Sequence, residues 1–214
     1  FLGFYLTGHP LGQHVNFIKK LSNIRLLDLA SHIEEAPAAT PENTYRRKRK
    51  EFLIGGMIVS VKLLTTKKQD KMAAFVFEDL DSSINCVIFP KTYNENKDLL
   101  IESNIVFLKC EIDNSRDEIQ LIVNKIIPLQ EAIETYTKAF VITLNDKNSF
   151  IDKVSSIKSA IAESKGNCPI YLKITNQKKN TAILQLSSEF NIKPNSKFET
   201  TIKNLLPEAL TSYE

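Results

Sequence analysis

The chain has 214 residues, of which 43% are hydrophobic and 25% charged, and its formal net charge is +3. This balance is typical of a globular protein with a buried core and does not place the chain among disordered proteins. No apolar run approaches the roughly 20 residues that span a bilayer, and no basic region followed by an apolar one opens the chain. We therefore expect neither a membrane segment nor a secretion signal.

The three cysteines, Cys86, Cys110 and Cys168, are odd in number and widely spaced. This pattern argues against a disulfide framework and is typical of a reducing cytosol, so we expect a cytoplasmic protein with small, buried thiols. Because the chain opens on Phe1 and not on Met, we also expect it to begin inside a longer protein.

Residues 1–35 predict a helical lead-in. Pro10 suits the first turn of a helix, and apolar residues then recur at helical spacing up to Leu21. A second short helix is expected over residues 26–33. The lead-in is too short to bury a core of its own.

Residues 36–51 predict a basic linker, because Pro37 and Pro41 interrupt regular structure. The linker carries five consecutive positive charges: Arg46, Arg47, Lys48, Arg49 and Lys50. Such a run is typical either of a solvated linker or of a segment that extends a path for nucleic acid, and both interpretations stay open.

Residues 52–130 predict a five-stranded β-barrel. Strands are expected over residues 52–63, 72–78, 84–89, 105–112 and 119–127, with a helix over 91–100 between the third and the fourth. Three strands, a helix and two strands is the order of the OB-type barrel, whose open face and loops bind oligonucleotides or oligosaccharides. Gly55 and Gly56 interrupt the first strand and predict a bulge or a tight bend there.

Residues 131–214 predict a small α+β domain. Its expected order is a strand over 139–144, a helix from an N-cap at Ser149 to near Gly166, strands over 170–174 and 181–186, and a final helix near 198–206. The fold class of the whole chain is therefore mostly β plus α+β, with a helical lead-in, an OB-type barrel and a strand–helix–strand–strand–helix domain.

Catalytic motifs are missing from this sequence. Glu78, Asp79 and Asp81 form a tight acidic group, but they fall at the predicted turn between the second and third strands, where Asp is favoured for local hydrogen bonds. The histidines lie in the lead-in without neighbouring metal ligands, and no glycine-rich phosphate loop is present. We therefore expect no catalytic activity, cofactor or metal site in this chain.

The predicted barrel offers a surface for nucleic acid. Single-strand binders combine a positive groove with side chains that stack on bases, and the loop between the first two strands is rich in lysine. We predict these binding residues: Lys62, Lys67, Lys68, Lys71, Asn85, Phe89, Lys91 and Arg116. Strand alternation places Phe75 and Phe77 in the core and Phe89 on the outer side, although packing beneath the following helix is an alternative role for Phe89. Because aromatic residues are few on this face, we expect weak, salt-dependent binding.

Residues 2–11 (LGFYLTGHPL) closely resemble the segment that precedes the OB domain in the alpha subunit of bacterial DNA polymerase III. Shorter matches follow in the barrel, at residues 55–58, 71–73, 78–80, 84, 87–90 and 121–123. Weaker matches follow in the tail, at residues 166, 169–172 and 192–194. The resemblance covers essentially the whole chain. In two places the sequence departs from the family: Ser82 stands where a turn glycine is usual, and the basic run at 46–50 is heavier.

This resemblance implies the C-terminal end of a replicative DNA polymerase, with the catalytic aspartates and the sliding-clamp motif upstream of Phe1. In that family the OB domain is associated with the single-stranded template and the terminal domain with docking the tau subunit of the clamp loader. We place this docking at Leu205, Leu206 and Leu210, with core packing as the alternative role for at least two of them.

Two other classes stay open. The barrel could be the anticodon-binding module of an aminoacyl-tRNA synthetase, although the short tail cannot be a synthetase catalytic domain. It could also be a pure protein-interaction module, which would have no DNA affinity even at low salt.

Overall fold

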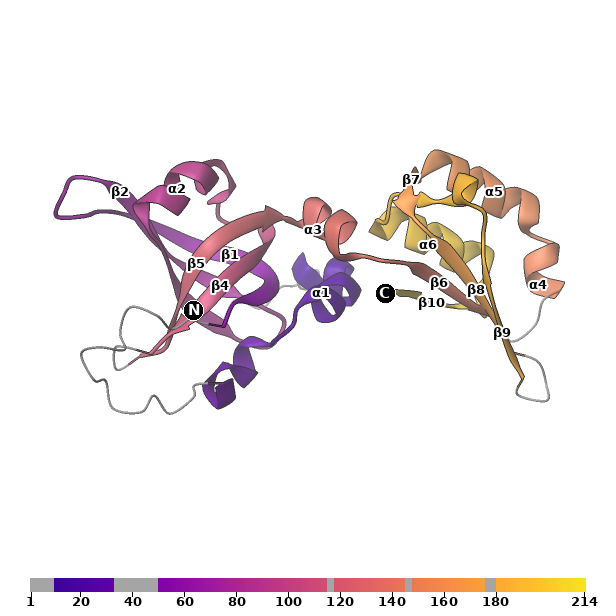
Figure 1. Cartoon of the computed structure of the whole chain (residues 1–214), viewed down its shortest axis with the longest axis horizontal. Coiled ribbons are helices and arrows are strands. Elements are labelled where there is room, and N and C mark those ends of the chain that lie inside the picture. Colours follow the sequence, from indigo (N-terminus) through magenta and orange to yellow (C-terminus); the bar gives the residue numbers. More distant parts are fainter. Residues whose placement is uncertain (1–9, 33–49, 115–117, 145–147, 176–179) are drawn as a thin grey trace. The chain divides into compact units, whose positions relative to one another are not determined.

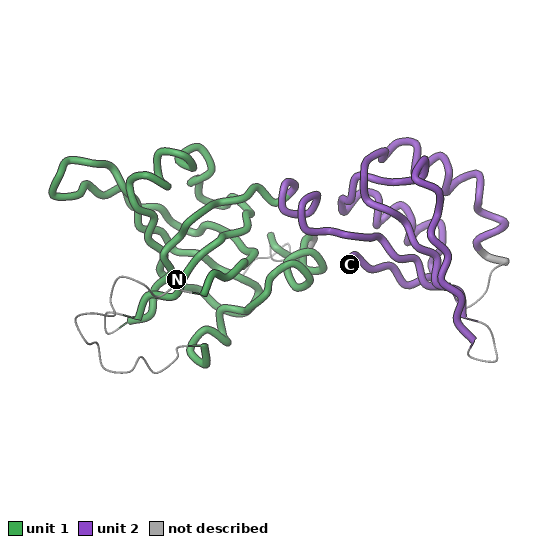
Figure 2. The backbone as a smooth tube through the Cα atoms, viewed as in Figure 1, with its two compact units in different colours: residues 1–129 green, residues 130–214 purple. Residues whose placement is uncertain are grey.

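A computed structural model describes residues 10–32, 50–114, 118–144, 148–175 and 180–214 of the chain (Figure 1). The chain divides into two compact units, Phe1–Leu129 and Gln130–Glu214, which are described separately (Figure 2). Within the described residues, no helix combines the length and the apolar character needed to cross a membrane.

The first unit contains a closed five-stranded barrel. Its strands are β1 (Phe52–Thr65), β2 (Lys71–Glu78), β3 (Ser83–Ile88), β4 (Ile105–Asp113) and β5 (Gln120–Pro128). They close in the order β1-β2-β3-β5-β4, with β3 and β5 parallel and the other pairs antiparallel. A helix, α2 (Pro90–Asn96), and the 3₁₀ turn η3 (Lys97–Leu99) connect β3 to β4. The predicted OB-type barrel is confirmed.

Strand β1 closes the barrel because it pairs with two neighbours along its length. Residues 52–57 pair with β4 and residues 57–65 with β2, and the register shifts between Ile58 and Ser60. The sequence predicted a bulge or a tight bend at Gly55 and Gly56. The bulge instead lies further along the strand, after these two glycines. Those glycines instead allow close packing: a β-carbon on Gly55 would lie 2.7 Å from the Phe107 ring, and one on Gly56 would collide with the Glu78 carbonyl oxygen.

The lead-in consists of η1 (Pro10–His14), α1 (Val15–Leu21) and η2 (Leu26–His32). It is helical as predicted, although its second helix is of the tighter 3₁₀ type. Leu26 and Leu29 belong to the same hydrophobic cluster as the barrel interior. The lead-in also binds β1 through the backbone, since the Leu53 amide donates to the Asn23 side chain (2.9 Å).

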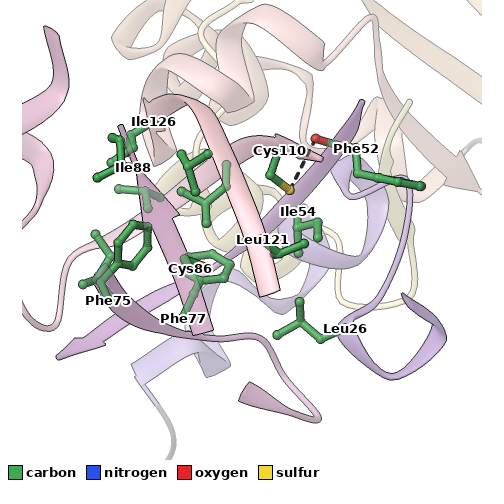
Figure 3. Close-up of a cluster of buried hydrophobic side chains, with 14 of the residues drawn as sticks. Leu26, Phe52, Ile54, Phe75, Phe77, Cys86, Ile88, Cys110, Leu121 and Ile126 are labelled. Atoms are coloured by element: carbon green, nitrogen blue, oxygen red, sulfur yellow. Dashed lines mark hydrogen bonds between the residues drawn. The ribbon is translucent and has the colours of Figure 1, made fainter. Parts of the chain in front are cut away.

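The barrel interior is a cluster of aliphatic and aromatic side chains with two cysteines among them (Figure 3). Cys86 and Cys110 are free and buried, and the Cys110 thiol lies 3.8 Å from the Phe52 carbonyl oxygen. Burial raises the pKa of Cys110 to about 12 and that of Cys86 well above its usual value. Both thiols therefore stay protonated and pack as small hydrophobic groups.

The second unit is built on a four-stranded sheet with the order β10-β6-β8-β9. The strands of this sheet are β6 (Phe140–Leu144), β8 (Ile170–Thr175), β9 (Thr181–Gln185) and β10 (Leu210–Tyr213). The unit has a further short strand, β7 (Lys165–Cys168), which lies outside the sheet. Its helices are α3 (Leu129–Tyr136), α4 (Asn148–Ile151), α5 (Val154–Glu163), the 3₁₀ turn η4 (Ser188–Phe190) and α6 (Ser196–Leu205). Buried residues of α5 and α6, among them Ile157 and Phe198, form the core with the inner face of the sheet.

Two details of this unit differ from the prediction. The helix expected from Ser149 to Gly166 is split into α4 and α5, because a turn closes where the Lys153 amide donates to the Phe150 carbonyl (3.1 Å). Ser149 lies within α4, and Lys153 occupies the N-cap position of α5. Strands β7 and β10 were not predicted, and β10 adds an antiparallel edge to β6.

Candidate nucleic-acid interface

The outer face of the barrel is defined by the register of its strands. Lys62 of β1 lies opposite Ala74 of β2, which lies opposite Val87 of β3. Paired residues share a face, so these three residues form one row across the sheet. A neighbouring row contains Ser60, Val76 and Asn85.

Half-buried aliphatic side chains line the middle of this face: Met72, Ala74, Val76, Val87 and Ile122. The alternation predicted for β2 is confirmed, since Phe75 and Phe77 are buried on the opposite, inner side. Ile122 and Gln120 of β5 extend the face through the parallel pairing with β3. No local sequence signal predicts this extension, because β3 and β5 are far apart along the chain.

Phe89, a base-stacking candidate from the sequence, has an exposed ring. It follows β3 directly and occupies the N-cap position of α2, where its carbonyl oxygen accepts from the Tyr93 amide (2.8 Å). Its side chain is 48% exposed. The backbone carbonyl of Phe89 therefore bonds to the first turn of α2 while its ring stays accessible. This exposure argues against the alternative of a ring packed beneath α2.

The loop between β1 and β2 holds Lys67 and Lys68 at the tip of a hairpin. The Thr66 amide donates to the Asp70 carbonyl (2.9 Å), and the Thr66 hydroxyl oxygen accepts from the Lys68 and Asp70 amides (both 3.2 Å). Gln69 adopts a left-handed conformation with φ of 68°. The loop is therefore a compact turn that fixes the starting positions of its lysine side chains.

The four lysines of this region, Lys62, Lys67, Lys68 and Lys71, are all exposed. None of their ammonium groups forms a salt bridge with another described residue. We call these four residues the lysine cluster. Its charges remain available to an anionic ligand. Lys62 lies in the outer row with Ala74 and Val87, whereas Lys71, at the start of β2, is in phase with the inward-facing Ala73 and Phe75.

The remaining predicted binding residues are dispersed. Asn85 is exposed on β3, opposite Gln120, and Lys91 is exposed in the first turn of α2. Lys50 lies just before β1 with its ammonium nitrogen 5.4 Å from the centroid of the Phe52 ring, a cation–π contact. Arg116 and the rest of the basic run, Arg46, Arg47, Lys48 and Arg49, lie outside the described residues, as do residues 2–9 of the motif near the start.

The acidic group at the β2–β3 turn serves the fold. Asp79 is buried, and its carboxylate accepts from the backbone amides of Leu26 (2.8 Å), Asp81 (2.9 Å) and Ser82 (2.9 Å). These bonds close the turn and tie the lead-in to the barrel. Ser82 is not among the described residues with positive φ, so this turn does not need the usual glycine. No group of three possible metal ligands occurs among the described residues.

The three leucines predicted to dock a partner have different environments. Leu206 is only 2% exposed and packs in the core of the second unit, so the prediction that it meets a partner is wrong. Leu205, the last residue of α6, is half-buried. Leu210 begins β10 at the edge of the sheet and is 72% exposed.

Comparison with known proteins first defines the class of the barrel. Residues 52–129 match the family described as the OB-fold nucleic acid binding domain, whose model is named for the tRNA anticodon. Among solved structures, the mitochondrial single-stranded DNA binding protein Rim1 of S. cerevisiae aligns with 39% of this chain and 96% of its own at 15% identity and a TM-score of 0.33.

Curated relatives then identify the particular protein that the chain resembles. The DNA polymerase III alpha subunit of Borreliella burgdorferi is 27% identical over 78% of this chain. That of Haemophilus influenzae is 22% identical over 100% of this chain. The chain spans only 13% and 17% of these two relatives. Its similarity to a region of the DNA polymerase III alpha subunit, expected from the sequence motifs, is confirmed.

Proposed function

We propose that this chain is a non-catalytic part of a bacterial DNA polymerase III alpha subunit, whose barrel weakly binds single-stranded template DNA in the cytoplasm. The supporting observation is the outer face of the barrel, which combines Lys62, next to the lysine-rich loop, with a strip of aliphatic side chains and the exposed ring of Phe89. The similarity to DNA polymerase III alpha subunits supports the replication context.

Binding on this face divides between phosphates and bases. The lysine cluster neutralises phosphates, which supplies affinity without sequence preference. Bases pack against Met72, Ala74 and Val87, and one base stacks on Phe89, a contact worth about 1–3 kcal/mol. With a single exposed ring on this part of the described barrel, the affinity depends mainly on charge.

A titration at two salt concentrations tests this proposal. If the lysine cluster contacts four phosphates, the affinity for a fluorescent oligonucleotide of about 15 nucleotides should fall roughly 50-fold between about 50 mM and about 200 mM salt. A complete lack of binding at the lower salt would contradict DNA binding and favour the protein-interaction module. Displacement by tRNA at far lower concentration than by unlabelled DNA would favour the anticodon-binding class.

We also propose that residues 131–214 form a domain that docks the tau subunit of the clamp loader, while the sliding clamp binds the parent subunit upstream of Phe1. The exposed Leu210 on an edge strand supports this placement, together with the neighbouring Leu205. An exposed leucine next to a free sheet edge is the kind of anchor that protein interfaces bury.

Replacing Leu210 with lysine tests the docking surface. We expect Leu210→Lys to weaken binding of the tau subunit from the same bacterium at least tenfold by calorimetry, because burying the new charge costs more than about 1.4 kcal/mol. Ile151→Lys is the matched control, since Ile151 is also a large aliphatic residue and is exposed on α4. Equal binding by native chain and Leu210→Lys would contradict a role for this residue.

A further inference from the structure

Strand β9 forms an exposed, uncharged edge of the sheet in the second unit. It is the last strand in the order β10-β6-β8-β9 and lies at the outer side of that sheet in Figure 1. All five of its residues are exposed, including Ile183 (66%) and Leu184 (52%), whose side chains lie on opposite faces of the strand. An aliphatic edge exposed on both faces can bind another strand.

The hydrogen bonds to β8 show which backbone groups remain for such a strand. The Leu186 amide donates to the Ile170 carbonyl (2.9 Å), and the same antiparallel register pairs Leu172 with Leu184. Since hydrogen-bonded residues alternate in an antiparallel ladder, Ala182 and Leu184 bond to β8. The amide and carbonyl groups of Thr181, Ile183 and Gln185 therefore point away from β8, toward the free edge.

The usual protection against edge pairing is missing from this strand. Natural edges carry charged residues, proline or a bulge that prevents another strand from adding. The sequence of β9 is Thr-Ala-Ile-Leu-Gln, and its pairing with β8 runs without a register shift. Both the side chains and the backbone of β9 can therefore accept a further strand.

We infer that β9 pairs with β9 of a second copy of this chain, antiparallel and centred on Ile183. In this register Ile183 faces its own equivalent, Thr181 faces Gln185, and the small Ala182 faces the large Leu184. The outward groups of Thr181, Ile183 and Gln185 would then form about six hydrogen bonds across the two-fold axis. No like charges meet, because the strand contains none.

Charged residues on the neighbouring strand β8 do not oppose the antiparallel pairing of two β9 strands. Lys173 of β8 lies opposite Ile183 and is the charged residue of the sheet nearest to the axis. The two copies of Lys173 would be separated by three strand spacings, about 14 Å, which exceeds the screening length of about 8–10 Å at ordinary salt. Leu210 lies on β10, at the opposite edge of the sheet, so this pairing and tau docking can fail independently.

Sedimentation of the full chain between about 1 and about 300 µM tests the inference, and we expect a reversible dimer in that range. Ile183→Pro removes an amide that faces away from β8, so it should raise the dimer dissociation constant at least tenfold while circular dichroism stays native. Ile183→Val keeps that amide and should remain within about threefold of the native chain. A monomer throughout the range, or a dimer that Ile183→Pro does not weaken, would overturn the inference.

Cysteine crosslinking tests the register and does not depend on the folding of the proline variant. Ile183→Cys places two thiols opposite each other, about 5.5 Å apart at the α-carbons, within the range of a disulfide. Thr181→Cys is the control, because its two copies would lie about 13 Å apart, too far to bridge. The native Cys86, Cys110 and Cys168 are buried and do not interfere. Equal crosslinking of the two variants, or none at position 183, would overturn the antiparallel register.

Discussion

Replacing Lys67, Lys68 and Lys71 with glutamate is expected to lower the affinity for single-stranded DNA about 100-fold at about 50 mM salt. Each of these ammonium groups is exposed and forms no salt bridge with another described residue, so each can release a counterion from the nucleic acid. The variant should also lose most of the salt dependence, because roughly 0.7 of the logarithmic slope disappears with each phosphate contact. Fluorescence anisotropy at several salt concentrations measures both effects.

A second variant tests whether the loss of affinity depends on where the lysines are replaced or only on the change in net charge. Lys153, Lys165 and Lys197 are exposed in the second unit, and their replacement by glutamate changes the net charge equally. We expect this control to lose less than about fivefold in affinity, since these exposed charges lie outside the proposed interface and contribute only through the screened net charge. If both variants lost affinity equally, the loop between β1 and β2 would have no specific role.

Replacing Asp79 with alanine is expected to destabilise the chain by about 3 kcal/mol. The buried carboxylate accepts three backbone amides, from Leu26, Asp81 and Ser82, and the variant leaves these donors without an acceptor. Two of the bonds close the β2–β3 turn and the third holds the lead-in, so the loss should affect the first unit as a whole. Urea denaturation followed by circular dichroism measures the free energy of unfolding.

Asp81 provides the matched control for this prediction. Its side chain is exposed, and its part in the turn is the backbone amide, which Asp81→Ala retains. We expect Asp81→Ala to change the free energy of unfolding by less than about 0.5 kcal/mol. A value for Asp79→Ala in the same range would show that the three hydrogen bonds do not hold the turn and the lead-in together.

The barrel was predictable from sequence because local signals and the final fold agree along it. Alternating aliphatic residues marked each strand, while Asp79, Pro90 and the lysine-rich loop marked the breaks, so predicted and observed strand ends differ by at most two residues. The outward position of Phe89 followed from the same alternation. Its exposure could not be predicted, because it depends on how α2 leaves the strand.

Features that depend on distant pairing were not predictable. The insertion of Leu26 and Leu29 into the barrel core, the parallel pairing of β3 with β5 and the addition of β10 to β6 all join segments far apart in the sequence. Leu206 shows the same limit at a single residue. Its helical spacing fits either a partner-facing surface or a core, and packing within the second unit decides for the core.

The central claim is that the outer face of the barrel binds single-stranded DNA. Chemical-shift mapping of the isotope-labelled chain with an unlabelled oligonucleotide tests it most directly. We predict that the largest amide shifts occur at Lys68, Met72, Asn85 and Phe89, with residues of the second unit unchanged. Shifts confined to residues 130–214, or an unchanged spectrum at low salt, would contradict the proposed interface.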